Sequence, residues 1–486
     1  MQKQSSNPYA SIMFLSESFE RQTLMPSDVV KSQLERIANL DRKLGSYQAI
    51  YESDALEAAK AADAAIASGH RIGPFHGVPF ALKDIFDVGG RVTACGSKAM
   101  RNRIPSHSGT IVRRLIAAGG ILLGKTKTVE CALGGWGTNQ YMGTPWNPWD
   151  LEHARVPGGS SSGSGVAVAS GLAMCATGTD TGGSVRLPAA YCGLVGLKVS
   201  KACLPTKGIL PLSSTLDTPG PMARSIADVT LMFEIMRGTE GWIIDRDKQQ
   251  KSGLFDFTIP TMSGLRLGIL DDHERQLCSA DILNTYDAAV DIFASLGAHI
   301  SVFSSPTPYA EMASANGAIT IFEGYHNHHA LYEIIENQMD EDVRKRILSG
   351  REMTDKSHAK HLHARAVAQE IFCKTIQEFD ALLTPTITKA APLLTEIDQN
   401  ISPGHFTRPF NYLDMCALAM PLSLTPHGLP TSLQIITREG QEALALRIGA
   451  TLESVLGITK NPDLSRFDYL GTQGPKTARQ NIKQQP

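Results

Sequence analysis

The alternation of short apolar segments with helical segments constrains the fold of this chain more than any other feature. Gly77-Val-Pro-Phe-Ala-Leu-Lys-Asp-Ile-Phe-Asp-Val88 is short, apolar and flanked by glycines, which predicts a buried strand with Lys83 near its end. A helix is expected over residues 110–118, followed by a strand over residues 121–124. Because such alternation is typical of a sheet flanked by helices, we predict an α/β fold.

The segments around this sheet suggest how the chain is organised. Apolar residues at helical spacing and an alanine-rich run predict an N-terminal helical segment over residues 1–70. A single main domain is expected over residues 71–465, in which the charge-rich residues 240–370 form a variable helical cap. Residues 466–486 are expected to be a loosely ordered tail. Three further apolar segments are expected to return to the same sheet: residues 379–385, 418–424 and 433–436.

The charge balance bears on the kind of partner. Lys and Arg total 46 and Asp and Glu total 48, so no field of either sign would gather nucleic acid or an anionic membrane. We therefore expect a small-molecule substrate, no nucleic acid and no membrane, and we leave a homodimer open. The absence of a long apolar run and of a signal-like N-terminus favours the cytoplasm. Eight cysteines without a CxxC pair favour reduced, mostly buried thiols.

Two segments rich in glycine and serine carry the strongest functional signal. Pro157-Gly-Gly-Ser160-Ser-Ser-Gly-Ser-Gly165 runs into an apolar stretch, which predicts a tight turn at the start of a buried helix. A second Gly-Gly-Ser lies in Thr179-Asp-Thr-Gly-Gly-Ser184-Val-Arg186-Leu-Pro188. Its consecutive backbone N–H groups are candidates for holding a developing oxyanion: Thr181, Gly182, Gly183 and Ser184.

A serine hydroxyl is a poor nucleophile at neutral pH, so another group must take its proton. A buried lysine can do this, because desolvation disfavours the ammonium form and lowers the pKa of the amine. Lys83, at the end of an apolar strand, fits that description. An ordinary surface lysine whose stem lies along the strand is the alternative, and the pattern alone leaves it open.

Taken together, these motifs resemble those of the amidase signature family. The resemblance is specific in the three segments that contain Lys83, Ser160 and Ser184. It continues through residues 193–198 and 214–224, and more weakly through residues 383–386 and 409–411. It implies a large mixed sheet with helices on both faces, built as a single domain with a helical cap.

The resemblance also implies a catalytic triad and a reaction. Ser184 would be the nucleophile, Ser160 the proton relay, preceded by a cis peptide bond, and Lys83 the base. The nucleophile would form an acyl-enzyme that water hydrolyses, with no cofactor and no metal. Asp180 and Arg186 match positions that brace the oxyanion loop.

The serine-rich segment departs from the family pattern at one position. Family members usually read Gly-Gly-Ser-Ser-Gly-Gly, whereas this chain has Ser162 at the fifth place. The extra hydroxyl would either perturb the relay or cap the following helix. Its neighbour Ser161 is expected to support the site.

Three rival patterns are dismissed by their context. Gly159-Ser-Ser-Ser-Gly163 matches the elbow of α/β-hydrolases, but no buried strand precedes it. Residues 119–126 formally fit a phosphate-binding loop, which must follow a strand and precede a helix. Here a helical segment comes before the loop and residues 121–123 are predicted to be strand, so the order does not fit. Histidines cluster within residues 326–329 and 358–363 without a recognisable set of metal ligands, so solvated helix faces are expected there.

Three functions remain in view: a stand-alone amidase, the glutamine-hydrolysing component of a tRNA-dependent amidotransferase (its A chain), and a catalytically silent binding protein with the same fold. The first is preferred because all three triad residues are present. An aryl or arylalkyl acyl group is considered, because aromatic residues lie in the segments expected near the site. The candidates for the pocket wall are Trp136, Tyr141, Met142, Phe322 and Tyr325.

Overall fold

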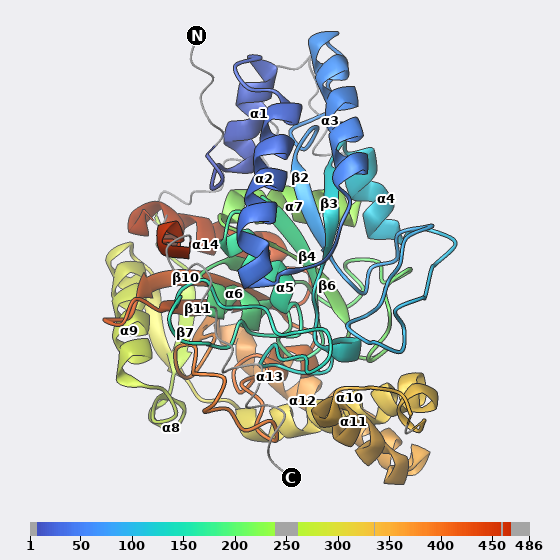
Figure 1. Cartoon of the computed structure of the whole chain (residues 1–486). Coiled ribbons are helices and arrows are strands. Elements are labelled where there is room, and N and C mark those ends of the chain that lie inside the picture. The colour runs from blue at the N-terminus through green and yellow to red at the C-terminus, as the bar shows by residue number, and fades with distance from the viewer. Residues whose placement is uncertain (1–6, 239–260, 335, 458–459, 468–486) are drawn as a thin grey trace.

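One mixed sheet of eleven strands organises the described part of the chain, which comprises residues 7–238, 261–334, 336–457 and 460–467 in this computed structural model. The strands lie in the order β1-β3-β2-β4-β6-β5-β10-β11-β9-β7-β8 (Figure 1). Their bounds are β1 Tyr47–Ile50, β2 Pro79–Lys83, β3 Ile121–Thr126, β4 Cys175–Asp180, β5 Val195–Lys198, β6 Thr218–Ala223, β7 Arg266–Leu270, β8 His299–Phe303, β9 Ala381–Pro385, β10 Cys416–Leu424 and β11 Pro430–Thr437.

Strand pairing is parallel near the two edges of the sheet and antiparallel in its centre. β3, β2 and β4 run parallel, as do β9, β7 and β8. The strands from β4 through β6, β5, β10 and β11 to β9 pair antiparallel, and β1 is antiparallel to β3 at its edge. The predicted α/β fold with a large mixed sheet is therefore confirmed. The three apolar segments expected to return to the sheet are β9, β10 and β11.

Helices cover both faces of the sheet. Their bounds are α1 Ile12–Glu20, α2 Pro26–Leu44, α3 Glu52–Ala67, α4 Thr110–Ala117, α5 Ser162–Ala169, α6 Arg186–Cys192, α7 Ile226–Arg237, α8 Asp272–Arg275, α9 Ala280–Ser295, α10 Tyr309–Tyr332, α11 Glu341–Leu348, α12 Asp355–Thr375, α13 Arg408–Tyr412 and α14 Glu442–Leu456. None of these helices has both the length and the apolar character needed to cross a bilayer.

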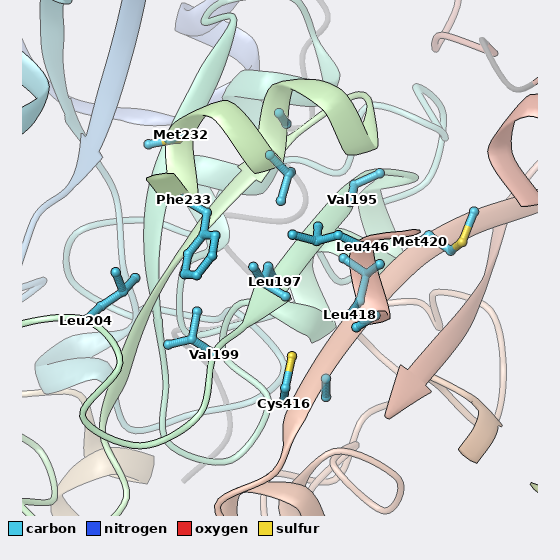
Figure 2. Packing of buried hydrophobic residues seen from close by; sticks show 14 of the residues in the cluster. Val195, Leu197, Val199, Leu204, Met232, Phe233, Cys416, Leu418, Met420 and Leu446 are labelled. Atoms are coloured by element: carbon cyan, nitrogen blue, oxygen red, sulfur yellow. The ribbon is translucent and has the colours of Figure 1, made fainter. Parts of the chain in front are cut away.

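Two of the three hydrophobic clusters in the described residues lie on opposite faces of the sheet, because side chains alternate along the strands. In β10, Leu418 and Met420 point into one cluster, and Ala419 between them belongs to the other. Figure 2 shows the first cluster, where β5 and β10 meet Phe233 of α7 and Leu446 of α14. The second cluster lies against α2, α3, α5 and α6. The sheet is thus buried on both faces over its central strands.

The N-terminal segment expected to be helical contains a strand that the pattern did not indicate. Residues 47–50 form β1, which pairs with β3 and so joins the main sheet. Only four residues long and partly exposed, this strand is too short to interrupt the helical signal on either side. The N-terminal helices α1 to α3 stand together at the top of Figure 1.

The region expected to be a helical cap divides into two parts. Residues 266–303 supply β7 and β8, which extend the sheet, and α9, which packs against it, so this part is not the helical cap that was predicted. β8 is an edge strand with mostly exposed side chains, so it lacks the apolar run that indicates a buried strand. Helices α10 to α12 form an outer layer, at the bottom of Figure 1. Residues 239–260 and most of the predicted tail, residues 468–486, lie outside the described residues.

The first cluster provides a test of packing energy. Leu418 is fully buried, and Leu418→Ala should lower the free energy of unfolding by about 2–5 kcal/mol, because it leaves a cavity in a close-packed core. Ile116 on α4 is 47% exposed, and Ile116→Ala should change that free energy by less than about 0.5 kcal/mol. Urea denaturation followed by circular dichroism measures both, and equal effects would contradict a close-packed core around Leu418.

Candidate active site

Lys83 is the last residue of β2 and is fully buried. Its Nζ donates hydrogen bonds to Ser160 Oγ and to Thr179 Oγ1, each at 2.7 Å. The neighbouring strand β4 supplies Thr179 because β2 and β4 run parallel and side by side. The alternative of a surface lysine is therefore wrong, and the amine lies beside the serine-rich loop.

The surroundings of Lys83 lower its affinity for a proton. Burial lowers its pKa to about 7, and the nearby carboxylates Asp217 and Asp180 offset this only in part. No carboxylate within the described residues forms an ion pair with Lys83, whose two Nζ partners are hydroxyl groups. Much of the amine is consequently neutral near pH 7, as a proton acceptor must be.

Ser160 follows a cis peptide bond between Gly159 and Ser160. The backbone here is packed tightly, since a Cβ atom on Gly159 would lie 2.5 Å from the carbonyl oxygen of Gly134. The Ser160 carbonyl accepts hydrogen bonds from the N–H of Val129 at 3.1 Å and from Thr128 Oγ1 at 3.0 Å. These contacts fix the loop that presents the Ser160 hydroxyl to Lys83.

Ser184 lies in the turn between β4 and α6 and is the most exposed of the three predicted triad residues, at 8%. Its carbonyl accepts a hydrogen bond from the N–H of Ser161 at 3.3 Å, which ties this turn to the loop that carries Ser160. Among the described residues, the hydroxyl groups of Ser160 and Ser184 do not form a hydrogen bond with each other. The structure therefore contains the Lys83–Ser160 half of the predicted relay and brings the Ser184 turn against it.

Asp180 and Arg186 form a fully buried ion pair, with Nη2 and Oδ1 2.9 Å apart. Burial alone would raise the pKa of Asp180, but the Arg186 guanidinium holds it well below its usual range. Arg186 also donates to Asn411 Oδ1 and Gln434 Oε1, both at 2.6 Å. The pair thus braces the turn around Ser184 from several elements.

The backbone of this turn corrects one prediction about the oxyanion donors. The N–H of Gly183 donates to Asp180 Oδ1 at 2.7 Å, so it is not available to a ligand. No hydrogen bond from the N–H groups of Thr181, Gly182 or Ser184 is found within the described part of the chain. The carbonyl of Gly182 is held by Thr407 Oγ1 at 2.8 Å, which fixes the peptide planes of the turn.

The serine-rich loop leads directly into α5. Ser161 is the N-cap residue of this helix, and its Oγ accepts a hydrogen bond from the N–H of Thr179 at 3.3 Å. Ser162 is the first residue of α5, and its buried hydroxyl has no hydrogen-bond partner among the described residues. The extra hydroxyl of this chain therefore neither caps the helix nor contacts Lys83 or Ser160.

A cavity of about 200 Å³ opens beside the residues that contact Lys83. Its wall includes Thr179 and Thr181, the half-buried carboxylate of Asp217 and the apolar side chains of Ile85 and Leu212. Thr181 Oγ1 donates to Asp217 Oδ1 at 2.6 Å, which closes that side of the cavity. The cavity therefore lies on the Thr181 side of the turn that carries Ser184.

The residues predicted for the pocket wall do not line this cavity: Trp136, Tyr141, Met142, Phe322 and Tyr325. Trp136 is buried and its indole N–H donates to the carbonyl of Ile401 at 2.8 Å. Tyr141 is 43% exposed, and Phe322 stacks on His358 with ring centroids 4.1 Å apart. Trp136 and Phe322 thus pack against other parts of the chain, and the assignment of these five residues to an acyl pocket stays a prediction.

Some residues that contact the site were not predicted from the sequence. Thr179 is part of the motif around Ser184, but no strand is predicted there, so its contact with Lys83 from the neighbouring strand β4 was not expected. Asn411 lies in the weakly matching segment 409–411, to which no role was assigned, and Gln434 carried no local signal; they reach Arg186 from α13 and β11. No group of three or more potential metal ligands is clustered anywhere in the described residues.

Comparison with known proteins agrees with this geometry. A family model described as Amidase matches residues 28–446. The chain is 30% identical to the A component of the glutamyl-tRNA(Gln) amidotransferase of Alkaliphilus metalliredigens (strain QYMF) over 484 residues, which cover 93% of this chain and 97% of that protein. It is 33% identical over 435 residues to 2-amino-5-chloromuconic acid deaminase of Comamonas testosteroni, covering 86% and 90%. The solved structure of a peptide amidase from Stenotrophomonas maltophilia matches with a TM-score of 0.80 at 25% identity, covering 94% and 99%.

The buried ion pair allows a test with a matched control. Asp180→Asn should lower the free energy of unfolding by about 3–5 kcal/mol, because it leaves the buried charge of Arg186 without a counter-charge. The pair of Arg266 and Asp380 has similar geometry at the surface, and Asp380→Asn should lower the same quantity by less than about 1 kcal/mol. Chemical denaturation of the two variants provides the comparison, and a small effect at Asp180 would refute the bracing role.

Proposed function

The chain belongs to the amidase signature family of C–N hydrolases, and on that premise we propose that it is a stand-alone serine amidase. Its reaction is the hydrolysis of a carboxamide to a carboxylate and ammonia or an amine. The observation that carries the proposal is the buried amine of Lys83 hydrogen-bonded to Ser160 without an ion-pair partner among the described residues. A silent binding protein would have no need to keep that amine desolvated.

In the proposed mechanism, neutral Lys83 takes a proton from the Ser160 hydroxyl as Ser160 takes one from Ser184. The Ser184 oxygen bonds to the amide carbonyl carbon, and the carbonyl electron pair moves onto its oxygen. Breaking of the C–N bond then releases the amine, which receives the proton back through the same relay. The relay requires a hydrogen bond from Ser184 to Ser160, which we expect to form when substrate binds, since catalytic hydrogen bonds often tighten only in the complex.

The developing oxyanion needs donors that are fixed before the reaction begins. We assign this role to N–H groups of Thr181, Gly182 and Ser184, because Gly183 is engaged by Asp180. In the second half of the reaction, a water molecule loses a proton to the same relay and attacks the acyl-serine ester. The products are the free Ser184 hydroxyl and the carboxylate.

The glutamine-hydrolysing component of an amidotransferase remains a second candidate function. The relative from Alkaliphilus bears that enzyme's name and matches this chain over nearly the whole length of both proteins. The relative from Comamonas is named for a deaminase of a small molecule instead, at similar identity. The two functions share the hydrolytic chemistry and differ in partners, so the purified chain separates them. Turnover of simple carboxamides by the chain alone supports the stand-alone enzyme, and turnover only in a complex supports the amidotransferase.

The nucleophile is tested by labelling. A fluorophosphonate probe should modify Ser184 in the purified protein, because the relay makes this hydroxyl reactive. Ser184→Ala should abolish labelling and reduce ammonia release by about 10,000-fold or more, and it should keep the circular dichroism spectrum of the parent. Peptide mapping by mass spectrometry identifies the modified residue. Modification at Ser161 would overturn the assignment.

The role of Lys83 predicts a pH dependence. Because its pKa is lowered to about 7, the amine is protonated below that pH, so kcat/KM should rise as pH increases through about 7 and then level off. Lys83→Arg should reduce kcat/KM by about 100- to 10,000-fold, since a guanidinium cannot accept the proton. The surface residue Lys60 is the control, and Lys60→Arg should leave the rate and its pH profile unchanged. An unaltered profile in Lys83→Arg would exclude the proposed base.

A further inference from the structure

The outer helix α10 contacts the turn that carries Ser184 through an asparagine. Asn316 lies in the first half of this helix and is 1% exposed. Its Nδ2 donates a hydrogen bond to the carbonyl oxygen of Thr181 at 3.1 Å, across 135 positions of the sequence. A Cβ atom on Gly182 would lie 3.1 Å from Asn316 Oδ1. The side-chain amide therefore packs directly against the peptide between Thr181 and Gly182.

The next two carbonyls of the turn are also held. The carbonyl of Gly182 accepts a hydrogen bond from Thr407 Oγ1 at 2.8 Å, and that of Gly183 accepts one from the N–H of Leu187 at 2.7 Å. Leu187 belongs to α6, which follows the turn directly, and Thr407 precedes α13. Of the three donors, Asn316 is the one that the outer layer of helices supplies.

The hydrogen bond from Asn316 fixes the direction of a backbone N–H group. The peptide between Thr181 and Gly182 is trans, so its C=O and N–H point in opposite directions. With the carbonyl turned toward Asn316, the N–H of Gly182 points away from α10, and no described residue accepts a hydrogen bond from it. In the next peptide, Asp180 takes the N–H of Gly183. Of these two consecutive peptides, the one held by Asn316 keeps a donor available to a ligand.

Gly182 would otherwise allow this peptide to rotate. Rotation of the peptide plane by half a turn changes ψ of Thr181 and φ of Gly182, and glycine adopts positive φ values that other residues avoid. In the rotated form, the carbonyl of Thr181 would point where the N–H of Gly182 points now. An oxygen atom would then face the developing oxyanion. Because the rotated form loses the hydrogen bond from Asn316, this bond favours the form that offers the N–H.

We propose that Asn316 is a positioning residue for the oxyanion hole, which holds the Thr181–Gly182 peptide so that the N–H of Gly182 donates to the carbonyl oxygen of the substrate. The inference rests on the proposed function, because it concerns the same attack by Ser184. Asn316 does not touch the reacting atoms and acts through the backbone. A donor that is fixed before substrate binds stabilises the transition state without reorganisation. The outer helix α10 thereby contributes to the geometry of the reaction.

Two substitutions separate positioning from packing. Asn316→Ala removes the donor, and kcat for butyramide should fall about 10- to 100-fold with KM changed by less than about twofold, because the oxyanion develops only in the transition state. Asn316→Asp keeps the size of the side chain and should lower kcat further, by about 100- to 1,000-fold. Its carboxylate repels the carbonyl of Thr181 and accepts the N–H of Gly182 in the rotated peptide.

Both variants are assayed at a temperature at which circular dichroism shows them to be fully folded. A role in packing alone predicts the reverse order, with the same-sized aspartate closer to the parent than alanine. That order, or an unchanged kcat in both variants, would overturn the proposal.

Gln33 provides a matched control for the loss of a buried amide. It is 2% exposed, and its Nε2 donates to the carbonyl of Gly171 at 3.4 Å, beyond the end of α5 that lies away from the serine-rich loop. Gln33→Ala should lower the melting temperature in the same way as Asn316→Ala and leave kcat unchanged. An equal loss of kcat in Gln33→Ala and Asn316→Ala would show a general effect of destabilisation and contradict positioning by Asn316.

Labelling of Ser184 tests the proposal without turnover. Negative charge develops on the phosphoryl oxygen of a fluorophosphonate as Ser184 attacks phosphorus and fluoride leaves, so the same N–H groups should accelerate this reaction. The second-order rate constant of labelling should fall about 10-fold or more in Asn316→Ala and stay unchanged in Gln33→Ala.

The labelling rates also distinguish the two proposals. If the parent protein is labelled at Ser184 with these rates and hydrolyses no amide, the proposed function fails and the role of Asn316 stands. If the parent protein hydrolyses butyramide and both Asn316 variants keep its kcat and its labelling rate, the role of Asn316 fails and the proposed function stands.

Discussion

The burial of an amine without a neighbouring ion-pair partner is the constraint on which the site depends. Three lysines are buried to nearly the same degree in this fold, and their partners differ. Lys125 forms an ion pair with Asp84 at 2.9 Å. Lys198 donates to two backbone carbonyls, and Lys83 meets only two hydroxyl groups. Within the described residues, the fold therefore places a carboxylate against the amine of Lys125 and none against the amine of Lys83, on the neighbouring strand.

The buried ion pair between Asp180 and Arg186 serves the opposite purpose, because it keeps both charges and uses them to hold backbone. Asp180 accepts hydrogen bonds from the N–H groups of Gly183 and Val185, so its carboxylate shapes the turn that carries Ser184. Arg186 extends this network to β11 and α13 through its amide partners. Since a paired and fully hydrogen-bonded charge is tolerated in the interior, the turn gains rigidity without an unsatisfied group.

The sequence was sufficient for residues that interact within short motifs and insufficient for those that meet across the fold. Lys83 and Ser160 could be predicted because a buried strand end and a glycine-rich turn are local patterns, and the family resemblance joined them. The use of the Gly183 N–H by Asp180 could not, because it depends on the conformation of one turn. Gln434 lies 248 positions from Arg186, and no local pattern links such residues. The strand β8 was missed although His299-Ile-Ser-Val302 alternates polar and apolar residues, because a strand of five residues is too short to stand out from the helical signal before and after it.

The presence of a hydrophobic cluster on each face of the sheet has a consequence for how the enzyme loses activity. In β2, Phe80 and Leu82 belong to one cluster and Ala81 to the other, so the strand that ends at Lys83 is anchored on both faces of the sheet. A local opening of the helices on one face leaves the other face still attached to this strand. Lys83 is thereby attached to a strand in the interior of the sheet and not to an edge strand. Loss of activity on heating is then expected to coincide with unfolding of the whole sheet. Residual activity therefore indicates that the sheet is still folded.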